Sequence, residues 1–363
     1  MKIVIDLRIY GPKYGGLGRY NQQLLDQLIK LDSQNQYVLL FRKNPKIDLP
    51  NNFAVEIVDC RWYSIKEQLV LPGILNKINA DLVHFPHFNV PIFYKGKFIV
   101  TIHDLIMTKF PSKRASTLNK YFFFIKYWFY KKVITYAVKK STKIIAVSKF
   151  TATDIKNYFK LSDKESEKIK TIYEGVTIVK TSDDAMVDLP KNYFLYVGNA
   201  YPHKNLEFLI KVFEEFIKKY PEYYLILVGN KNYFYQRLEN ETNCQNIIFP
   251  GFVPDDQISS YYKNATAYVF PSLYEGFGLP PLEAMTHGTP VISSNSSCLP
   301  EILGQSVLYF DPKDKGDLQN KLEELIKTPE LAEILAKNGQ NQLKKYSWDT
   351  MGRAILDIYN SQK

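Results

Sequence analysis

Cysteine is scarce in this chain, and long apolar runs are absent. The three cysteines, Cys60, Cys244 and Cys298, lie far apart and form no Cys-x-x-Cys or Cys/His cluster, which argues against a structural zinc site and favours reduced, buried thiols. No stretch of about 18 uncharged apolar residues occurs, and Asp6 follows too early for a secretory leader. We therefore expect a cytoplasmic protein, either soluble or at the inner face of the cytoplasmic membrane.

The positive charge of the chain is concentrated in one segment. The net charge is +10, and residues 113–143 hold nine Lys or Arg residues, nine aromatic residues and no acid. Two interpretations stay open: a basic aromatic helix that binds an anionic membrane or a lipid-linked acceptor, or an amphipathic helix with core aromatics and solvated lysines. Nucleic acid would compete as a partner, but we expect none. In the first interpretation, the side chains that contact the membrane or the acceptor are those of Lys120, Lys131, Lys132 and Trp128.

Size and patterning predict two α/β domains. With 363 residues, of which 45% are hydrophobic and 23% charged, the chain is long for one domain. Strand-length apolar segments alternate with helix-length periodic ones, which is typical of parallel sheets covered by helices. We expect strands at residues 2–7, 37–41, 55–59, 82–85, 98–103 and 143–147, and then at 193–198, 224–229, 246–249, 267–271, 290–293 and 307–310.

A polar stretch at residues 179–191 is the expected linker. It separates an N-terminal domain, residues 1–178, from a C-terminal domain, residues 192–346. Closing helices are expected at residues 315–327 and 329–346, and a last one, begun by a Ser347 N-cap, should cross back to the first domain within residues 347–363. Open α/β sheets bind ligands at the carboxyl ends of their strands, so the strand ends are where functional residues are sought.

Two glutamates frame the most informative segment of the chain. Glu275 and Glu283 are separated by Gly-Phe-Gly-Leu-Pro-Pro-Leu and follow an expected strand. Paired prolines suit the first turn of a helix, so the segment is predicted to run strand, loop, helix. Gly276 and Gly278 allow tight turns and would leave the N–H groups of Phe277, Gly278 and Leu279 available to a phosphate or a sugar oxygen. An ordinary capped helix with a surface glutamate remains the alternative.

Strand ends in the first half carry a glycine loop and a histidine. The loop GGLGR (residues 15–19) could bring backbone amides close to a phosphate, although neither a dinucleotide fingerprint nor a Walker loop is completed. His103 ends a strand beside Asp104, whose carboxylate could set the tautomer of a histidine that bonds a substrate hydroxyl. His84 and His87 lie near another strand end. A satisfied structural histidine is the alternative for each.

In the second half, Lys204 stands at the start of an expected helix within YVGNAYPHKNL (residues 196–206). An ammonium beside helix-end amides would clamp a diphosphate, and a solvated lysine in a turn is the alternative. Gly251-Phe252-Val253-Pro254 follows another strand end and could offer backbone groups to a flat base.

Together these segments resemble one family over nearly the whole chain. The chain resembles the retaining glycosyltransferases of family 4 (glycosyl transferases group 1), which have two Rossmann-like parallel-sheet domains facing a central cleft in the GT-B fold. The segment YVGNAYPHKNL is similar in sequence to the corresponding segment of bacterial surface-polysaccharide mannosyltransferases. The segments that carry the resemblance are GGLGR, TIHD (101–104), AVSKF (146–150), YVGNAYPHKNL, GFVPDDQI (251–258) and SLYEGFGLPPLEAMTHGTPVISSNSSCLPEI (272–302).

The resemblance implies an acceptor-binding N-terminal domain and a donor-binding C-terminal domain. Catalytic roles fall to Glu275, His103 and Lys204, with Lys204 on the donor diphosphate, Glu275 on the sugar and Glu283 on the ribose hydroxyls. His203 stands where many members have arginine, so it could be partly charged near the diphosphate, or Arg19 could compensate. The remaining implied donor contacts are Gly15, Gly16, Ser148, Gly198, Asn199, Phe252, Val253, Gly276, Phe277, Gly278 and Leu279.

The implied reaction is transfer of a hexose from a nucleotide sugar to a hydroxyl of a growing glycan or lipid-linked acceptor, with retention and with no metal or other cofactor. Mannose from GDP-mannose in lipopolysaccharide or other surface-polysaccharide synthesis is favoured. Alternatives are a UDP- or ADP-sugar-dependent glucosyl or N-acetylglucosaminyl transferase, and a non-catalytic binder of anionic lipid or nucleic acid. Among related architectures, an epimerase would need no acceptor and a phosphorylase would need pyridoxal.

Overall fold

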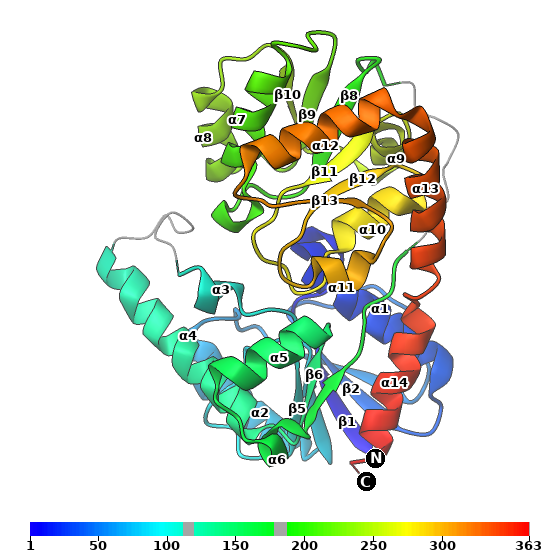
Figure 1. Cartoon of the computed structure of the whole chain (residues 1–363). Coiled ribbons are helices and arrows are strands. Elements are labelled where there is room, and N and C mark those ends of the chain that lie inside the picture. The colour runs from blue at the N-terminus through cyan, green and yellow to red at the C-terminus, as the bar shows by residue number, and fades with distance from the viewer. Residues whose placement is uncertain (112–119, 178–186, 363) are drawn as a thin grey trace. The chain divides into compact units, whose positions relative to one another are not determined.

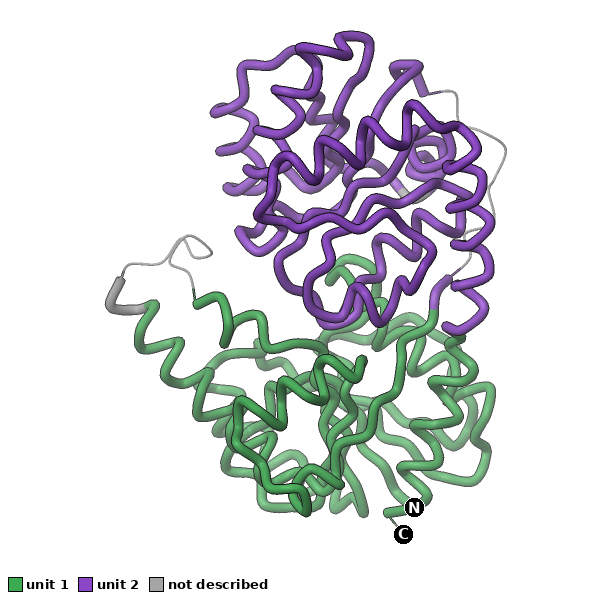
Figure 2. Tube along the Cα trace, in the orientation of Figure 1, with its two compact units in different colours: residues 1–175, 347–363 green, residues 176–346 purple. Residues whose placement is uncertain are grey.

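Two parallel sheets, each covered by helices, form the framework of the chain (Figure 1). The computed structural model describes residues 1–111, 120–177 and 187–362, apart from the side chains of residues 120–122 and 255. Most of the predicted linker, residues 179–191, therefore lies outside the described residues, as do Lys113 and Arg114 of the basic segment. The chain divides into unit 1, residues 1–175 with 347–363, and unit 2, residues 176–346 (Figure 2).

Within the described part of unit 1, seven parallel strands form one sheet in the order β3-β2-β1-β4-β5-β6-β7. They are β1 (Lys2–Asp6), β2 (Gln36–Phe41), β3 (Phe53–Ile57), β4 (Leu82–Phe85), β5 (Phe98–Ile102), β6 (Lys143–Ala146) and β7 (Ile169–Thr171). The helices of this unit are α1 (Gly15–Leu31), α2 (Ile65–Ile78), α3 (Ile106–Lys109), α4 (Lys120–Lys140), α5 (Lys149–Tyr158), α6 (Asp163–Ser166) and α14 (Trp348–Asn360), with a 3-10 turn, η1 (Pro12–Tyr14).

Both faces of the first sheet are covered, and this explains why its strands have uninterrupted runs of apolar residues. Ile3 and Ile5 belong to one buried cluster with Leu24 of α1, whereas Val4, between them, belongs to the cluster on the other face. Successive strand residues point to opposite faces, so a strand buried on both sides shows no polar alternation. All three of these side chains in β1 are completely buried, as expected for an interior strand of a sheet that is covered on both faces.

Within the described part of unit 2, six parallel strands follow the order β10-β9-β8-β11-β12-β13. They are β8 (Tyr193–Val197), β9 (Tyr224–Val228), β10 (Ile247–Gly251), β11 (Ala267–Phe270), β12 (Val291–Ser294) and β13 (Leu308–Phe310). The helices are α7 (Leu206–Phe216), α8 (Tyr233–Glu241), α9 (Asp255–Lys263), α10 (Leu279–Thr286), α11 (Leu299–Leu303), α12 (Lys315–Lys327) and α13 (Pro329–Leu343), with a 3-10 turn, η3 (Pro202–Lys204).

The last helix of the chain belongs to unit 1, where α14 packs on α1. The Ser347 hydroxyl accepts the Thr350 N–H, as the predicted N-cap requires. Gly352 makes the close approach feasible, because a Cβ at that position would lie 2.5 Å from Cβ of Gln27.

A buried hydrogen-bond chain ties the end of α14 to the sheet. The hydroxyl of Tyr359 lies 2.6 Å from Nδ1 of His84, and Nε2 of His84 lies 2.9 Å from the hydroxyl of Thr101. Burial, with a smaller contribution from His103, lowers the pKa of His84 to about 3, so the ring is neutral. His84 is therefore a structural histidine, which was the alternative that the sequence left open.

All twelve segments predicted as strands contain strands, with ends shifted by at most a few residues. The strand β7 was not predicted. Its sequence, Ile169-Lys170-Thr171, is short and mostly polar, because β7 lies at the edge of the sheet and buries little of its surface. An edge strand of this kind lacks the apolar run by which the others were found.

The strand orders place a switch point in each sheet. Chain order reverses between β1 and β4 in unit 1 and between β8 and β11 in unit 2, where the two strands pair directly. At such a point the connections leave in opposite directions, and a crevice opens beyond the carboxyl ends of the two strands. Each unit therefore carries one place where a ligand is expected on topological grounds.

Candidate active site

The crevice of unit 2 brings Lys204 and Glu275 together. Lys204 follows β8 and Glu275 follows β11, 71 residues later, yet Nζ of Lys204 lies 2.6 Å from Oε1 of Glu275. Their side chains are only 11% and 10% exposed. The two residues to which catalytic roles were assigned in this half of the sequence thus form one buried ion pair at the switch point.

Local backbone geometry positions Lys204. Pro202 begins the 3-10 turn η3, which ends at Asn205 in the left-handed conformation (φ 61°). The Asn205 amide donates to the carbonyl of Pro312, and the N–H of Leu273, in the loop after β11, donates to the carbonyl of His203. The first bond ties the loop after β8 to the segment after β13, and the second ties it to the loop after β11, so Lys204 is held beside Glu275 by these loop contacts as well as by charge.

The aromatic ring of Phe270, at the end of β11, lies beneath the lysine ammonium. Nζ of Lys204 is 5.3 Å from the ring centroid, within the range of a cation–π interaction. The ammonium therefore has a carboxylate and an aromatic face as neighbours, and it is oriented before any ligand arrives. Among the described residues, no group of three or more His, Cys, Asp or Glu could hold a metal ion.

Glu275 is positioned by a serine that the sequence reasoning missed. The N–H of Glu275 donates to Oγ of Ser297 at 2.9 Å, and Ser297 adopts the left-handed conformation (φ 55°) that aims this hydroxyl at the loop. The neighbouring Ser294 donates to the carbonyl of Ser272, again tying the loop after β12 to the loop after β11. The serine-rich stretch Ser293–Ser297, which begins in the last residues of β12 and continues beyond it, was the available signal, since it stands at the same edge of the sheet.

The segment between the two glutamates folds as strand, loop and helix, as predicted. Gly278 takes a positive φ of 92°, and α10 begins at Leu279 with both prolines in its first turn. The side chain of Phe277 is buried against the ring of Tyr346, with 5.4 Å between ring centroids, so only its backbone remains for a ligand. Glu283 lies partly buried on α10, one helix turn beyond the loop.

The protonation state of the His203 ring is set by its burial and by the neighbouring Lys204. Burial, together with the positive charge of Lys204, lowers the pKa of His203 to about 4. The imidazole is therefore neutral near pH 7 in the protein without ligand, and a partial charge on it beside a bound diphosphate stays a prediction. The cationic group of this loop is Lys204.

Two further predicted donor contacts follow β8. Gly198 has a φ of 158°, and a Cβ there would lie 2.7 Å from the hydroxyl of Tyr196, so the position excludes larger residues. That hydroxyl donates to the carbonyl of Asn199 at 2.7 Å, and the side-chain oxygen of Asn199 accepts the N–H of Tyr201. The loop is thus rigid, with its polar groups partly committed within it.

The predicted base-facing residues, Phe252 and Val253, behave differently from each other. They follow β10, which ends at Gly251 with a φ of 84°. The side chain of Phe252 is 67% exposed, whereas that of Val253 is buried. An aromatic ring is therefore free to stack on a flat base at Phe252, while Val253 could contribute its backbone only.

In unit 1, His103 is bound on both sides of its ring. Nδ1 lies 2.9 Å from Oε1 of Glu174, and Nε2 lies 3.0 Å from the carbonyl of Pro86. Burial acts to lower the pKa of His103, but the hydrogen bond and the charge of Glu174 outweigh it, and the pKa is raised. Two acceptors suit an imidazolium, which donates from both nitrogens.

The carboxylate that sets the state of His103 is Glu174, and the prediction of Asp104 in this role is wrong. Oδ1 of Asp104 instead accepts the N–H of Ile106 at the start of α3. Glu174 follows β7, the strand that the sequence did not reveal, and this is why it was missed. Had β7 been predicted, Glu174 would have been placed at the carboxyl edge of the sheet with His103.

The other predicted residues of unit 1 lie at helix starts. Gly15 and Gly16 are exposed and begin α1, with Gly15 at a φ of 65°, while Arg19 lies on the following turn. Ser148 is fully buried, and its hydroxyl accepts the N–H of Thr151 as the N-cap of α5. A donor-binding role for the Ser148 side chain is therefore not supported, because its hydroxyl serves the helix and has no exposed surface.

The basic aromatic segment forms α4, which combines the two interpretations left open. Tyr130, Val133 and Ile134 face the core, whereas Phe124, Ile125 and Phe129 are exposed and Trp128 keeps 54% of its surface. A groove runs along the outer side; it is lined by Trp128, Lys131, Lys132, Thr135, Tyr136, Lys139 and Lys140. The side chain of Lys120 lies outside the described residues. Over the part of the chain that the structure covers, no helix is both long and apolar enough to cross a membrane.

Known proteins are similar to this chain in sequence or in fold. O-antigen chain mannosyltransferase B of Escherichia coli is 27% identical over 292 residues, which cover 77% of this chain and 74% of that protein. Sucrose-phosphate synthase of Thermosynechococcus elongatus has a TM-score of 0.79 at 19% identity, covering 99% of this chain and 98% of that one. Anabaena HepE in complex with UDP-glucose has a TM-score of 0.72 at 15% identity, covering 99% and 100%.

Two family models match adjoining parts of the chain. The model described as Glycosyltransferase Family 4 matches residues 14–179, which lie mostly in unit 1. The model described as Glycosyl transferases group 1 matches residues 180–342, which carry the Lys204–Glu275 pair. With two parallel-sheet units and both models spanning residues 14–342, the chain belongs to the family 4 (group 1) glycosyltransferases and has the GT-B fold.

Proposed function

We propose that this glycosyltransferase moves a hexose, with mannose from GDP-mannose the favoured case, from a nucleotide sugar to a hydroxyl of a growing glycan or lipid-linked acceptor of the cell surface. The observation that carries the proposal is the buried Lys204–Glu275 pair at the switch point of unit 2. A cation and a carboxylate held side by side suit the two ends of a sugar diphosphate, because one can meet the phosphate charge and the other can accept from sugar hydroxyls.

In the proposed reaction, Lys204 binds the diphosphate and Glu275 the sugar. The bond between the anomeric carbon and the phosphate oxygen breaks, and an acceptor hydroxyl bonds to that carbon from the same face. The acceptor proton passes to the departing phosphate oxygen. Negative charge grows on the diphosphate as the bond lengthens, and the Lys204 ammonium, already oriented over Phe270, stabilises it without further reorganisation. Glu275 positions the sugar and forms no covalent bond.

The proposed roles need no metal ion, because Lys204 supplies the positive charge at the leaving group. Glu283 on α10 would bind the ribose hydroxyls, and exposed Phe252 would stack on the base. Gly15 and Gly16 at the start of α1 offer exposed amides for a donor phosphate. These assignments concern each unit by itself and can be tested by single substitutions.

The donor is proposed from the name of the E. coli relative, an O-antigen chain mannosyltransferase. HepE was solved with UDP-glucose, which makes a UDP-sugar the main alternative. A thermal-shift panel of GDP-mannose, UDP-glucose, UDP-N-acetylglucosamine and ADP-glucose separates them, and the expected result is the largest stabilisation by GDP-mannose. A larger shift with a UDP- or ADP-sugar would overturn the choice of donor while leaving hexosyl transfer intact.

Turnover decides between an enzyme and a binding protein. Release of free nucleotide from the stabilising donor should continue in EDTA, and NMR of the product should show the anomeric configuration of the donor. Loss of release in EDTA would contradict metal independence, and inversion would contradict retention. If no donor is hydrolysed or transferred, the chain is a non-catalytic binder on this scaffold.

We further propose that α4 places the enzyme on an anionic membrane, where a lipid-linked acceptor would be found. Exposed Phe124, Ile125, Trp128 and Phe129 lie on a helix whose charged residues are all lysines, and Nζ of Lys132 lies 5.3 Å from the centroid of the Trp128 ring. Exposed aromatics beside lysines are typical of a helix that lies in the headgroup region. The fully core interpretation would have buried these aromatics.

Liposome flotation tests this surface. Binding to vesicles with anionic lipid should exceed binding to neutral vesicles, and it should fall with salt and with the double substitution Lys131→Glu and Lys132→Glu. The matched control, Lys337→Glu with Lys344→Glu, makes the same change of charge at an exposed position of α13 and at its exposed C-cap residue. An equal loss of vesicle binding in both double variants, or binding that does not depend on salt, would contradict the proposal and leave α4 with a structural role only.

A further inference from the structure

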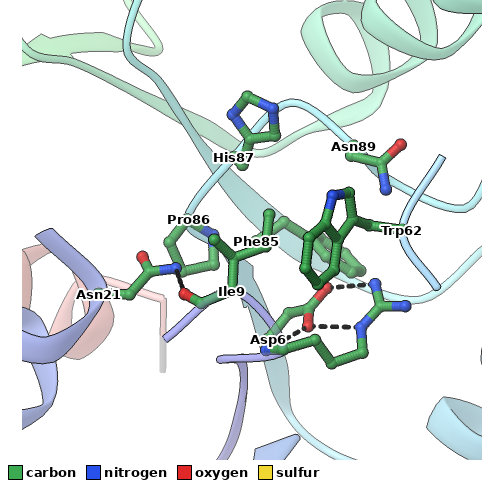
Figure 3. A pocket seen from close by; sticks show the side chains of 9 residues that line it. Asp6, Ile9, Asn21, Trp62, Phe85, Pro86, His87 and Asn89 are labelled. Carbon is green, nitrogen blue, oxygen red and sulfur yellow. Dashed lines mark hydrogen bonds and ion pairs between the residues drawn. The ribbon is translucent and has the colours of Figure 1, made fainter. Parts of the chain in front are cut away.

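Ion pairs fix the backbone beyond β1 at the switch point of unit 1. Arg8 binds Asp6 with bonds of 2.7 and 2.6 Å (Figure 3), and it binds Glu67 of α2 at 2.5 Å. The cavity beside them, with Asn21 and His87 in its wall, has a volume of about 20 Å³, the space of a single water molecule. At the switch point of unit 2, the loop before α10 is held by a different kind of contact, the packing of an aromatic ring.

The ring that holds this loop is that of Tyr346. The ring of Phe277, in the loop, meets the Tyr346 ring edge to face, with 5.4 Å between the centroids and 85° between the planes. Both side chains are buried. A side chain in a closely packed site has few rotamers open to it, so its backbone is restricted as well. The contact therefore restricts the backbone that carries the N–H groups of Phe277, Gly278 and Leu279.

Tyr346 is itself tied to α11. Its hydroxyl donates to the carbonyl of Ile302 at 2.6 Å, and the side-chain amide of Gln342 donates to the same carbonyl, also at 2.6 Å. Carbonyls in the last turn of a helix have no partner within that helix, and here two side chains supply partners for one of them. The position of the Tyr346 ring is thus set by α11 as well as by its contact with Phe277.

The loop also contacts α11 directly. A Cβ at Gly278 would lie 2.8 Å from Cδ2 of Leu299, the first residue of α11, so the loop backbone lies against that side chain. Ser297, two residues before the helix, accepts the Glu275 N–H at 2.9 Å. These two ties, and the one that runs through Tyr346, fix the loop on α11.

Tyr346 stands apart from the groups to which the nucleotide is assigned in the proposed reaction. Lys204 follows β8, Phe252 follows β10, and Glu283 lies on α10, which packs on α13. Tyr346 is the last residue of unit 2, after α13, and its ring contact is with Phe277 in the segment assigned to the sugar. A change at Tyr346 should therefore act on the sugar end of the donor and leave the nucleotide end largely unaffected.

We propose that Tyr346 is a positioning residue for the transferred sugar. Its ring, packed on Phe277 and tied to α11, holds the N–H groups of residues 277–279 and the carboxylate of Glu275 in the geometry that binds the sugar. Tyr346 acts through Phe277 and not by contact with the donor. Groups of this kind lose much of their effect when they are displaced by about 1 Å. This rests on the proposed function and deepens it, because binding of the sugar, and not of the nucleotide, then depends on Tyr346.

Calorimetry on the full chain measures the two ends of the donor separately. GDP-mannose is compared with GDP, and UDP-glucose with UDP. The Kd of the nucleotide diphosphate divided by the Kd of the nucleotide sugar gives the part of the affinity that belongs to the sugar. In Tyr346→Leu we expect this ratio and kcat each to fall about tenfold, while the Kd of the nucleotide diphosphate changes by less than about twofold. An equal weakening of both ligands, or an unchanged ratio, would overturn the positioning role.

Two further variants separate positioning from general packing. Tyr346→Phe keeps the ring on Phe277 and removes only the bond to Ile302, so most of the ratio should be retained. Tyr193 supplies the matched control, since it is a buried tyrosine at the amino end of β8 whose hydroxyl donates to the carbonyl of Tyr261 at 2.8 Å. Tyr193→Leu should lower the thermal midpoint, as Tyr346→Leu does, and leave the ratio unchanged. An equal fall of the ratio in both Leu variants would refute the positioning role.

A double-mutant cycle tests whether Tyr346 acts through Phe277. Phe277→Leu should lower the ratio by a similar factor, and Tyr346→Leu should add little to that effect. Additive effects of the two substitutions would contradict the route through Phe277. Phe277→Leu also carries the test if Tyr346→Leu does not fold.

The outcomes distinguish this inference from the proposed function. If a donor is transferred and Tyr346→Leu leaves the ratio unchanged, the positioning role is wrong and the transferase proposal stands. If a nucleotide sugar binds but is never transferred, and the ratio falls in Tyr346→Leu, the transferase proposal is wrong and Tyr346 still positions a bound sugar. If no nucleotide sugar binds, both are wrong.

Discussion

Replacing Glu275 by Gln removes the negative partner of a buried ammonium and almost nothing else. The glutamine side chain has the same shape as glutamate, and its Oε1 can still accept a hydrogen bond from Lys204. The backbone N–H of residue 275 keeps its bond to Oγ of Ser297. The substitution therefore isolates the charge of Glu275 from its geometry. The stability of the protein and the rate of transfer should both fall, while the affinity for the donor should stay nearly unchanged.

The size of the stability loss follows from the geometry of the pair. Two unit charges 2.6 Å apart attract by about 6 kcal/mol at an effective dielectric constant of about 20. Most of this attraction is offset by the free-energy cost of removing the two charges from water. In the variant, Lys204 also keeps its contact with Phe270 and a hydrogen bond to the glutamine. We expect a net loss of about 2 kcal/mol, which lowers the thermal midpoint by roughly 4–8 °C for a unit of this size.

Donor affinity and turnover should separate. In Glu275→Gln the ammonium no longer has to be shared with a carboxylate, so the donor Kd should change by less than about threefold, while kcat falls by about 10²–10³-fold. In Lys204→Met, by contrast, an uncompensated carboxylate faces the diphosphate, and the Kd should rise by about tenfold to hundredfold. Calorimetry with the active donor and a nucleotide-release assay give the two quantities.

The double variant provides the control. Because Lys204→Met alone leaves a buried unpaired carboxylate, adding Glu275→Gln should restore part of the lost stability, so the two single effects should not add. Additive midpoint shifts would show that the pair is not coupled. Unimpaired turnover in Glu275→Gln, or a loss of donor affinity equal to that of Lys204→Met, would refute the assignment of Glu275 to the sugar and Lys204 to the diphosphate.

Three other predictions concern separate residues. Glu283→Ala should raise the donor Kd in calorimetry, and an unchanged Kd would remove Glu283 from the ribose. The raised pKa of His103 contributes stability that is present below the unfolded pKa of 6.5 and is lost as pH rises through the folded pKa. In Glu174→Gln the carboxylate is gone, so burial should bring the pKa of His103 below 6.5. An NMR titration of His103 that shows no decrease in this pKa would contradict the pairing with Glu174. Tyr359→Phe leaves Nδ1 of His84 unpaired and should cost about 1–3 kcal/mol, seen as a lower thermal midpoint; a negligible shift would show that this bond does not hold α14 to unit 1.

The comparison of sequence and structure is clearest at the strand ends. The apolar runs that predicted the strands are local, so the motifs that follow them could be assigned to the carboxyl edges of two sheets before any fold was known. Gly278, Pro280 and Pro281 likewise predicted the start of α10, because backbone freedom at glycine and the missing N–H of proline act over one or two residues.

Partners distant in the chain could not be predicted in the same way. Glu174 was missed because β7 buries too little to carry an apolar pattern, and Asp104 was chosen only because it is adjacent in sequence to His103. Ser297 was missed because the serine-rich stretch that contains it does not show which hydroxyl meets Glu275, and that contact depends on the pairing of β11 with β12. In each case the deciding contact is between strands, and its energy depends on the order in which they pair.

The sequence by itself therefore determined which residues stand at the ends of strands and which chemistry they could support, because hydrophobic periodicity and turn chemistry are local. Only the tertiary structure decided which of them meet. Placing β8 next to β11 brings Lys204 to within 2.6 Å of Glu275 across 71 residues, and placing β1 next to β4 brings the region of Asn21 and His87 around one cavity. Strand order is set by the packing of whole sheets and helices, and no short segment contains it.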